Sequence, residues 1–292
     1  PSGASARAGL RGGPVPAGVF GFGAAVTKPA CAEPPSNYSP LKVPGTVVKD
    51  IDGLEAGTNH GRAADKYVYS ASVVNQWLEK PSTQPKNKKI VFVTFDDGPT
   101  TKFTGEQLDN LEKAGARATF FMIPPQMRDV GKNMLSRSLK MGNALAIHSY
   151  SHDYKYLYHG SAANKAKHIS CDWDWAMAQS RAILGSNYFS SAFRYPGGHM
   201  SWTNLSQADA TLAKRGVGWI DWNAMSGDAD AQRPTTVPGY LQMVKKSIKE
   251  SNNPNVVVIL NHDTYGKQMT AKAMPSILAW LKSQGYEFGV IA

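Results

Sequence analysis

From residue 90 to the end of the chain, short apolar runs alternate with segments whose apolar residues recur at helical spacing. The apolar runs are continuous, which is typical of strands buried on both faces. The predicted strands cover residues 90–95, 118–123, 144–148, 192–195, 218–222, 256–260 and 287–291. The predicted helices cover residues 104–114, 133–141, 164–184, 206–215, 239–251 and 271–283. This alternation predicts a parallel sheet of about six or seven βα units that closes into a barrel.

The first part of the chain has a different texture. Residues 1–47 are rich in Gly, Ala, Pro and Ser and lack sustained periodicity, so we expect a disordered tail or a signal-peptide remnant, followed by a linker. Arg7 and Arg11 precede a mostly apolar stretch, and the Ala-Cys-Ala tripeptide at 30–32 resembles a signal-peptide cleavage site. Cleavage there would leave Cys171 as the one cysteine and exclude an internal disulfide.

Two further segments follow this tail. Residues 48–87 are expected to form an N-terminal extension with little structure beyond a short helix over 72–80. Residues 88–292 carry the βα pattern and are predicted to form the functional domain. Removal of residues 1–47 is therefore expected to leave activity intact.

Composition narrows the class of protein. The chain has 292 residues, 42% of them hydrophobic, which is enough for one large domain. The net charge of +10 and the pI near 9.5 favour an anionic partner such as a cell-wall polymer. The basic residues are scattered and match no nucleic-acid-binding motif, so we expect no nucleic-acid partner. No apolar run is long enough to span a bilayer, and the two cysteines form no zinc-type pair.

Polar and titratable side chains follow the predicted strands. In parallel α/β folds, the residues that carry chemistry gather at the carboxyl ends of the strands. The residues found there are Asp96 and Asp97, His148 and His152, Arg194 to Gly198, Trp222 and Asp228, and Leu260 to Asp263. Each of these strand ends delivers a charged or metal-binding group to the same edge of the sheet.

The two histidines four residues apart suit a metal site. On one helical turn or in a tight loop, His148 and His152 would bring both imidazoles to one point. With a single carboxylate they would form a two-histidine site that leaves positions open for water and substrate. The spacing alone is weak evidence, but its position behind a strand end, beside the Asp96-Asp97 pair, favours this interpretation.

Other strand-end residues admit two interpretations. His262 is either a general acid or a histidine hydrogen-bonded to the backbone. Arg194 is either a surface cation or an arginine held beside a glycine-rich loop that a substrate can approach closely. The acidic pair itself is either a turn or a catalytic pair, and the neighbouring strand ends favour the catalytic pair.

Together these residues resemble the NodB-homology polysaccharide deacetylases, carbohydrate esterase family 4. The resemblance covers roughly residues 88–292 and rests on ordered motifs. They are Thr94-Phe95-Asp96-Asp97-Gly98-Pro99, His148-Ser149-x-x-His152, Arg194-x-Pro196-x-Gly198 and Leu260-x-His262. The fourth family motif departs from the pattern: Asp228 holds the aspartate position, but Ala229 replaces the usual tryptophan, and Trp222 is a candidate to take over its place.

The resemblance implies a fold and a division of labour. The fold would be α/β, a distorted (β/α)7-type barrel with an N-terminal extension. Asp97, His148 and His152 would hold a divalent metal, with Zn²⁺ preferred over Co²⁺ or Ni²⁺. Asp96 would act as general base, His262 as general acid, and Arg194 and Asp228 would orient these two. Gly197, Trp222, Leu260 and Tyr195 would contact the substrate.

The implied activity is metal-dependent hydrolysis of N-acetyl groups on N-acetylglucosamine polymers. The positive charge and the possible export signal favour secreted action on bacterial peptidoglycan, outside the cell or at the wall. Chitin oligosaccharides and acetylxylan are the alternative substrates. An inactive carbohydrate-binding barrel and a metal-independent amidohydrolase are other classes, which the intact set of aspartates and histidines disfavours.

Overall fold

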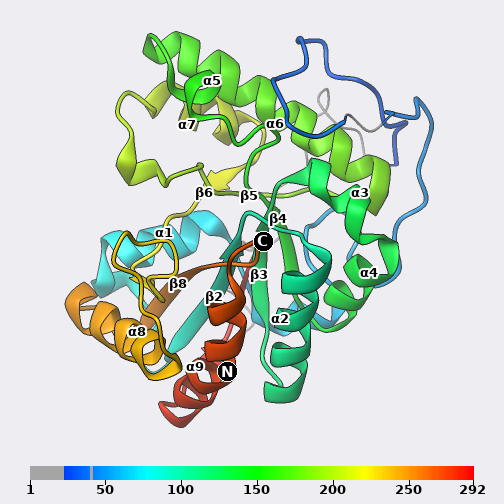
Figure 1. Ribbon diagram of the computed structural model, residues 1–292. Helices are drawn as coiled ribbons and strands as arrows, with labels where there is room; N and C mark the ends of the chain where they lie inside the picture. The colour runs from blue at the N-terminus through cyan, green and yellow to red at the C-terminus, as the bar shows by residue number, and fades with distance from the viewer. Residues whose placement is uncertain (1–22, 40–41) are drawn as a thin grey trace.

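The computed structural model describes residues 23–39 and 42–292. Its main sheet is parallel, with strand order β6-β5-β4-β3-β2-β8-β7, and helices cover its outer side (Figure 1). The eighth strand of this sheet, β9, also pairs with β2. The prediction of a distorted (β/α)7-type barrel is confirmed. No helix within the described ranges is both long enough and apolar enough to cross a membrane.

The bounds of the elements follow the sequence pattern closely. The strands are β1 Val68–Tyr69, β2 Ile90–Asp96, β3 Ala118–Met122, β4 Ala144–Ile147, β5 Ala192–Phe193, β6 Gly218–Trp219, β7 Ala224–Met225, β8 Val256–His262, β9 Glu287–Phe288 and β10 Val290–Ile291. The helices are α1 Ala71–Glu79, α2 Thr101–Ala114, α3 Met127–Val130, α4 Lys132–Lys140, α5 Tyr154–Tyr158, α6 Ala162–Leu184, α7 Ser206–Lys214, α8 Val237–Ser251 and α9 Gln268–Ser283. Helices α3 and α5 and strands β1 and β7 were not predicted, because each is too short to show periodicity.

Strand β2 is the centre of the fold. All seven of its residues are buried, and it lies between β3 and β8. The register places Asp96 beside Phe121 of β3 and His262 of β8. Parallel pairing therefore brings the last residues of β2 and β8 to one edge of the sheet, as the sequence pattern predicts.

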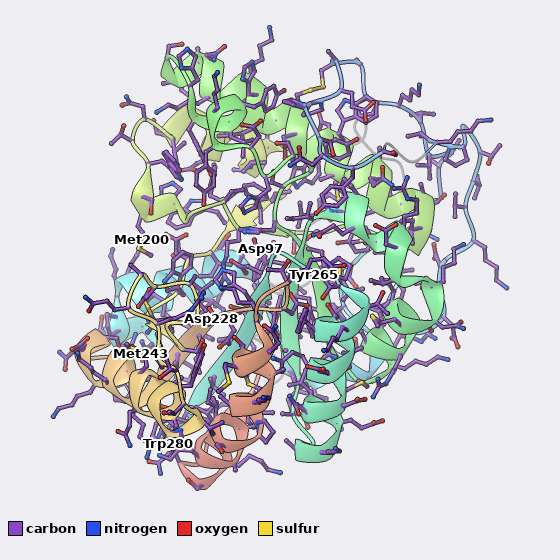
Figure 2. The ribbon with its side chains drawn as sticks, viewed as in Figure 1. Asp97, Met200, Asp228, Met243, Tyr265 and Trp280 are labelled. Carbon is purple, nitrogen blue, oxygen red and sulfur yellow. A yellow bond between two sulfur atoms is a disulfide. The ribbon has the colours of Figure 1, made fainter. Side chains whose placement is uncertain are left out.

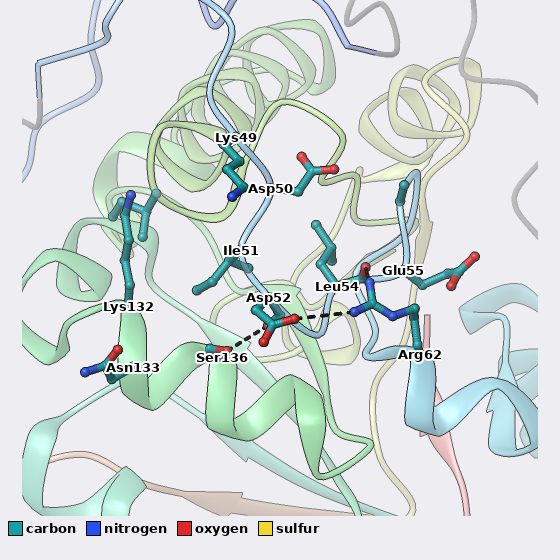
Figure 3. A pocket seen from close by; sticks show the side chains of 12 residues that line it. Lys49, Asp50, Ile51, Asp52, Leu54, Glu55, Arg62, Lys132, Asn133 and Ser136 are labelled. Carbon is teal, nitrogen blue, oxygen red and sulfur yellow. Dashed lines mark hydrogen bonds and ion pairs between the residues drawn. The ribbon is translucent and has the colours of Figure 1, made fainter.

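The N-terminal extension packs on the barrel. Strand β1 pairs in parallel with β10, and Val74 of α1 is fully buried. The extension also contacts α4, where Ser136 Oγ donates a hydrogen bond to the Asp52 carbonyl at 2.8 Å. Figure 3 shows the charged cavity between these two segments, with the Asp52–Arg62 ion pair at its wall. The short helix expected over 72–80 is present as α1.

The expectation of a disordered tail does not fit the described part of residues 1–47; residues 1–22 and 40–41 lie outside the description. Residues 24–39 and 42–47 carry no helix or strand, but they are fastened to the barrel. Cys31 forms a disulfide with Cys171 of α6, and Val26 and Val43 are buried. Cleavage at the Ala-Cys-Ala tripeptide would remove Cys31, so this cross-link and that cleavage site exclude each other.

The Cys31–Cys171 disulfide closes a loop across a sequence separation of 140 residues. Such a cross-link stabilises a protein mainly by restricting the unfolded chain, and the effect grows with loop length. We expect Cys31→Ser to lower the free energy of unfolding by about 2–5 kcal/mol, measured by urea denaturation. The double variant Cys31→Ser/Cys171→Ser should lower the free energy of unfolding by no more than Cys31→Ser alone. If reduction of the wild-type protein left its urea midpoint unchanged, that result would contradict the cross-link.

Candidate active site

Three side chains at the carboxyl edge of the sheet converge on one point. They are Asp97, directly after β2, and His148 and His152, which follow β4. Asp97 Oδ1 lies 3.3 Å from His148 Nε2 and 3.2 Å from His152 Nε2, and one donor atom of each residue lies within 4.8 Å of the others. Figure 2 shows Asp97 at this edge of the sheet. The three residues that were predicted to be metal ligands therefore lie close together in the structure.

The protonation pattern of these residues fits a divalent cation. His148 Nδ1 lies 2.8 Å from the Arg194 carbonyl oxygen, which can only accept a hydrogen bond. Nδ1 thus carries a proton, and Nε2, on the side of Asp97, is the nitrogen that can ligate a metal. Asp97 Oδ1 is buried and accepts no well-aligned hydrogen bond from any described residue. An uncompensated buried carboxylate oxygen beside two imidazoles is the donor set that zinc-type sites use.

Charge interactions keep Asp97 ionised. Burial on its own would raise the pKa of this carboxyl group, but the neighbouring His148 and His152 imidazoles, with His262, lower it well below its usual value. Burial likewise opposes protonation of His148, and the charges of Asp96 and Asp97 outweigh it and raise the pKa of this imidazole. The site therefore stabilises positive charge at its centre.

The ligand loops are shaped by the backbone rather than by a helix. Asp97, Ser149 and His152 have φ values of 74°, 98° and 48°, in a region that non-glycine residues rarely adopt. Of the two possibilities left open for the histidine pair, the tight loop is correct. Such conformations persist only where surrounding contacts enforce them.

Asp172 supplies those contacts for the histidine loop. Its carboxylate, buried within α6, accepts hydrogen bonds from the Tyr150 N–H at 2.7 Å and the Ser151 N–H at 3.0 Å. The Ser151 hydroxyl donates to it at 2.6 Å. The sequence interpretation missed this residue, because Asp174 lies two positions later in the same predicted helix and nothing in the sequence separates the two aspartates.

Asp96 is held by Arg194, as the resemblance implies. Arg194 Nη1 donates to Asp96 Oδ1 at 2.9 Å, and neither side chain is more than 3% exposed. The same nitrogen donates to Thr94 Oγ1 at 2.7 Å, while Nε and Nη2 donate to backbone carbonyls. Asp96 Oδ2 remains directed toward His148 Nε2, 3.6 Å away. One carboxylate oxygen is thus pinned, and the other faces the site.

His262 and Asp228 form a second pair next to the metal ligands. Asp228 Oδ1 lies 2.7 Å from His262 Nδ1, and Oδ2 accepts from the His262 N–H and the Thr270 hydroxyl. His262 Nε2 faces Asp97 Oδ2 at 3.9 Å. Burial lowers the pKa of His262, but the hydrogen bond and charge of Asp228, together with Asp97 and Asp96, raise it to about 9.

Replacing Asp228 with asparagine is expected to lower kcat about 100-fold with little change in KM, because His262 loses the partner that fixes its ring and charge. Acetate release under saturating substrate measures this effect. Lys267→Ala is the matched control, since Lys267 Nζ donates to the Asp228 backbone carbonyl and not to its carboxylate. A 100-fold rise in KM at constant kcat would instead place Asp228 in substrate binding.

The predicted substrate contacts lie around this centre. Gly197 has φ 79°, and no described residue accepts a hydrogen bond from its N–H. At Gly198, with φ 88°, a Cβ atom would lie 2.7 Å from Trp222 Cη2, so only glycine fits against this ring. Leu260 and Trp222 are partly exposed at the edge of the site, whereas Ala229 is exposed at the surface.

Tyr195 is a correction. Its side chain is fully buried, and its hydroxyl donates to Asp209 Oδ1 at 2.7 Å. Neighbouring residues of an extended segment point to opposite sides, so Tyr195 faces α7 because Arg194 faces Asp96. The phenol therefore stabilises the outer layer and does not contact the substrate.

Two further buried polar residues lie behind the Asp97 turn: Gln126, which was not predicted, and Asp263, which was predicted only as one of the strand-end residues. Gln126 Nε2 donates to the Asp97 carbonyl at 2.7 Å and to the Gly98 carbonyl at 3.2 Å. Asp263 accepts from the Thr104 hydroxyl at 2.6 Å, and its other oxygen, Oδ1, has no partner among the described residues. Burial raises the pKa of Asp263 to about 7, assisted by Asp97 and Asp96 and opposed by Thr104. Nothing in the sequence marks Gln126 as part of the site.

Sequence comparisons identify relatives of this chain. Residues 83–214 match the family model described as polysaccharide deacetylase. The putative polysaccharide deacetylase YheN of Bacillus subtilis is 31% identical over 210 residues, covering 71% of this chain and 69% of YheN. A bifunctional xylanase/deacetylase of Pseudobutyrivibrio xylanivorans is 30% identical over 210 residues. That match covers 72% of this chain and only 31% of the length of the bifunctional protein.

Solved structures give the same result. A CE4 esterase of Streptococcus mutans superposes with a TM-score of 0.74 at 39% identity, covering 84% of this chain and all of that one. The catalytic domain of a peptidoglycan N-acetylglucosamine deacetylase from Eubacterium rectale superposes with a TM-score of 0.58 at 29% identity. This second match covers 73% of this chain and 94% of the other.

Proposed function

The chain belongs to the polysaccharide deacetylase family, and from this premise we propose that it removes N-acetyl groups from N-acetylglucosamine polymers, with peptidoglycan as its substrate. One observation carries the proposal. Two oriented groups lie next to the Asp97, His148 and His152 cluster: Asp96 held by Arg194, and His262 held by Asp228. This arrangement places a base and an acid beside a cation site.

The residues divide the reaction between them. Asp96 Oδ2 takes the proton of the attacking water, because Oδ1 is already engaged by Arg194. The Gly197 N–H donates to the oxyanion that develops on the acetyl carbonyl. His262 Nε2 gives its proton to the leaving nitrogen, with Asp228 fixing Nδ1–H on the other side of the ring.

Asp97, His148 and His152 are the residues that would hold the metal, and zinc suits two imidazoles and one carboxylate, with Co²⁺ or Ni²⁺ as alternatives. A divalent cation supplies Lewis acidity toward a carbonyl and lowers the pKa of water. The buried, unpaired Asp97 Oδ1 supports this assignment, because such an oxygen is costly unless a cation compensates it.

The net charge of the chain and its disulfide both support peptidoglycan as the substrate. The net charge of +10 complements an anionic wall polymer, and the E. rectale relative is named for activity on peptidoglycan. The Cys31–Cys171 disulfide is typical of proteins that work outside the reducing cytosol, which supports an extracellular or wall-associated location.

Chitin oligosaccharides and acetylxylan are alternative substrates. The same residues would hydrolyse an acetyl ester, and one relative is a xylanase/deacetylase. Ala229 lies at the surface in place of the tryptophan usual in the family, and Trp222 instead covers Arg194, with its ring 5.5 Å from the guanidinium carbon. Because this difference from the family affects the wall of the pocket, we expect it to change which substrate binds and not how the acetyl group is hydrolysed.

Acetate release from peptidoglycan, N-acetylglucosamine oligomers and acetylxylan, each with and without added zinc, tests the proposal. We expect zinc-dependent release from peptidoglycan with the highest kcat/KM. Release from acetylxylan alone would identify an esterase. No release from any polymer by zinc-loaded protein would favour a carbohydrate-binding barrel.

A further inference from the structure

Residues 31–39, here called the strap, connect the disulfide to the active site and lie outside the segment matched by the family model. In Figure 1 this blue segment runs beside α6. Its first end is anchored by the Cys31–Cys171 bond and by the Trp175 indole, which donates to the Cys31 carbonyl at 3.2 Å. The Tyr150 hydroxyl, from the loop between the two metal-ligating histidines, bonds to Glu33.

The other end of the strap reaches the backbone of a metal ligand. The Tyr38 hydroxyl donates to Gln126 Oε1 at 2.8 Å, and Gln126 Nε2 donates to the Asp97 carbonyl at 2.7 Å. Arg128 Nη1 donates to the Ser39 carbonyl at 2.7 Å. The strap is therefore held at both ends, and its middle, residues 35–37, bridges beside the site.

A cavity of about 440 Å³ lies between this middle part and the histidine loop. The strap contributes Pro35, Ser36 and Asn37 to one wall, and the other wall includes His152, Tyr154 and Lys155. The Tyr154 ring is 45% exposed, and its centroid lies 5.6 Å from that of His152. The cavity thus opens directly beside a residue of the metal cluster.

The lining of the cavity indicates the chemistry of its ligand. It offers hydroxyl, amide, carboxylate and ammonium groups together with an exposed aromatic ring. Polar groups that fix orientation beside an aromatic surface suit a hydroxyl-rich ring that carries an amide. Its volume exceeds that needed for a single acetyl group, which binds at the metal cluster.

We propose that the strap forms a sugar subsite, which binds the unit next to the N-acetylglucosamine undergoing deacetylation. This inference rests on the proposed function and adds that specificity for chain length comes from a segment outside the barrel. Asn37 contributes hydrogen bonds from an exposed position on the strap, and Tyr154 contributes the ring face. Productive binding of a polymer then requires the disulfide, because Cys31 fixes the strap to α6.

The test compares two substrates for each variant: an N-acetylglucosamine pentamer and 4-nitrophenyl acetate, which is too small to reach the strap. The readout is the ratio of kcat/KM on the pentamer to that on the ester. We expect Asn37→Ala to lower this ratio about 3- to 10-fold through KM, the loss of one or two hydrogen bonds. Cys31→Ser is expected to lower it further, by about 10-fold or more, since the disulfide that anchors one end of the strap is lost.

Lys28→Ala is the control, because Lys28 is exposed on the segment that precedes the disulfide. Its ratio should equal that of the wild type. A ratio that stays within about 2-fold of wild type in both Asn37→Ala and Cys31→Ser overturns the subsite, even if the pentamer is deacetylated. Asn37 is exposed, so Asn37→Ala remains informative if Cys31→Ser fails to fold. Hydrolysis of the ester without acetate release from any sugar polymer overturns the proposed function itself, and the subsite with it.

Discussion

Replacement of Asp96 by asparagine is expected to remove nearly all turnover while the metal site stays loaded. The amide can still accept the Arg194 hydrogen bond that holds Asp96 Oδ1 at 2.9 Å, so the fold of this buried corner should persist. It cannot take a proton from water. Loss of a positioned general base lowers kcat by about 10²- to 10⁴-fold, and we expect a value in this range.

Turnover by acetate release and metal content by elemental analysis together test this prediction. Asp52→Asn is the matched control, because Asp52 is an exposed aspartate far from the metal ligands, paired with Lys140. The control should retain wild-type turnover. If Asp96→Asn lost the metal and Asp97→Asn retained it, the two carboxylates would have the opposite roles to those assigned here.

The division of labour between Asp96 and Asp97 follows from features that the sequence partly contains. The continuous apolar run before Asp96 predicts a buried central strand, and parallel pairing fixes which residues share its end. His262 was therefore placed correctly at the same edge of the sheet as Asp96, because β8 has the same buried texture as β2. Long strands with a clear hydrophobic pattern therefore allow the residues at their ends to be placed from the sequence.

Short elements carry less of it. Strand β5 has only two residues, so no alternation was available to show that Tyr195 turns away from the site where Arg194 enters it. Helix α5, which begins at Tyr154 beside the metal ligands, is likewise too short for a hydrophobic period to predict it.

The strap shows a different limit. Residues 24–39 lack any period because their backbone bonds to side chains and loops rather than to a regular ladder, and such segments look the same as disordered tails in composition. Cys31 can pair with Cys171 only if residues 24–39 cross the right surface of α6. That path is set by the folded barrel, so it could not be predicted from the sequence. From the structure we expect removal of residues 1–47 to lower activity, because it also removes Tyr38, which supports the Gln126 contact to Asp97.

Removal of the metal is expected to have the largest effect of all. Without a cation, the reaction loses the Lewis acidity that the Asp97, His148 and His152 cluster is arranged to hold, and deacetylation should fall below detection. Zinc added to the chelated wild type should restore activity at about one ion per chain. Because zinc binds the folded state, it should also stabilise the protein by about 2.7 kcal/mol at a free concentration 100 times Kd.

His152→Ala tests the assignment through both readouts. It should abolish activity and the thermal shift on adding zinc, because one of three ligands is lost while His148 stays in place. His159→Ala is the matched control, since His159 is an exposed histidine outside the cluster, and it should retain both. Full activity in protein shown to be free of metal would contradict the metal mechanism. A zinc-induced shift that survives in His152→Ala would instead move the binding site to other residues and leave the buried Asp97 Oδ1 without its cation.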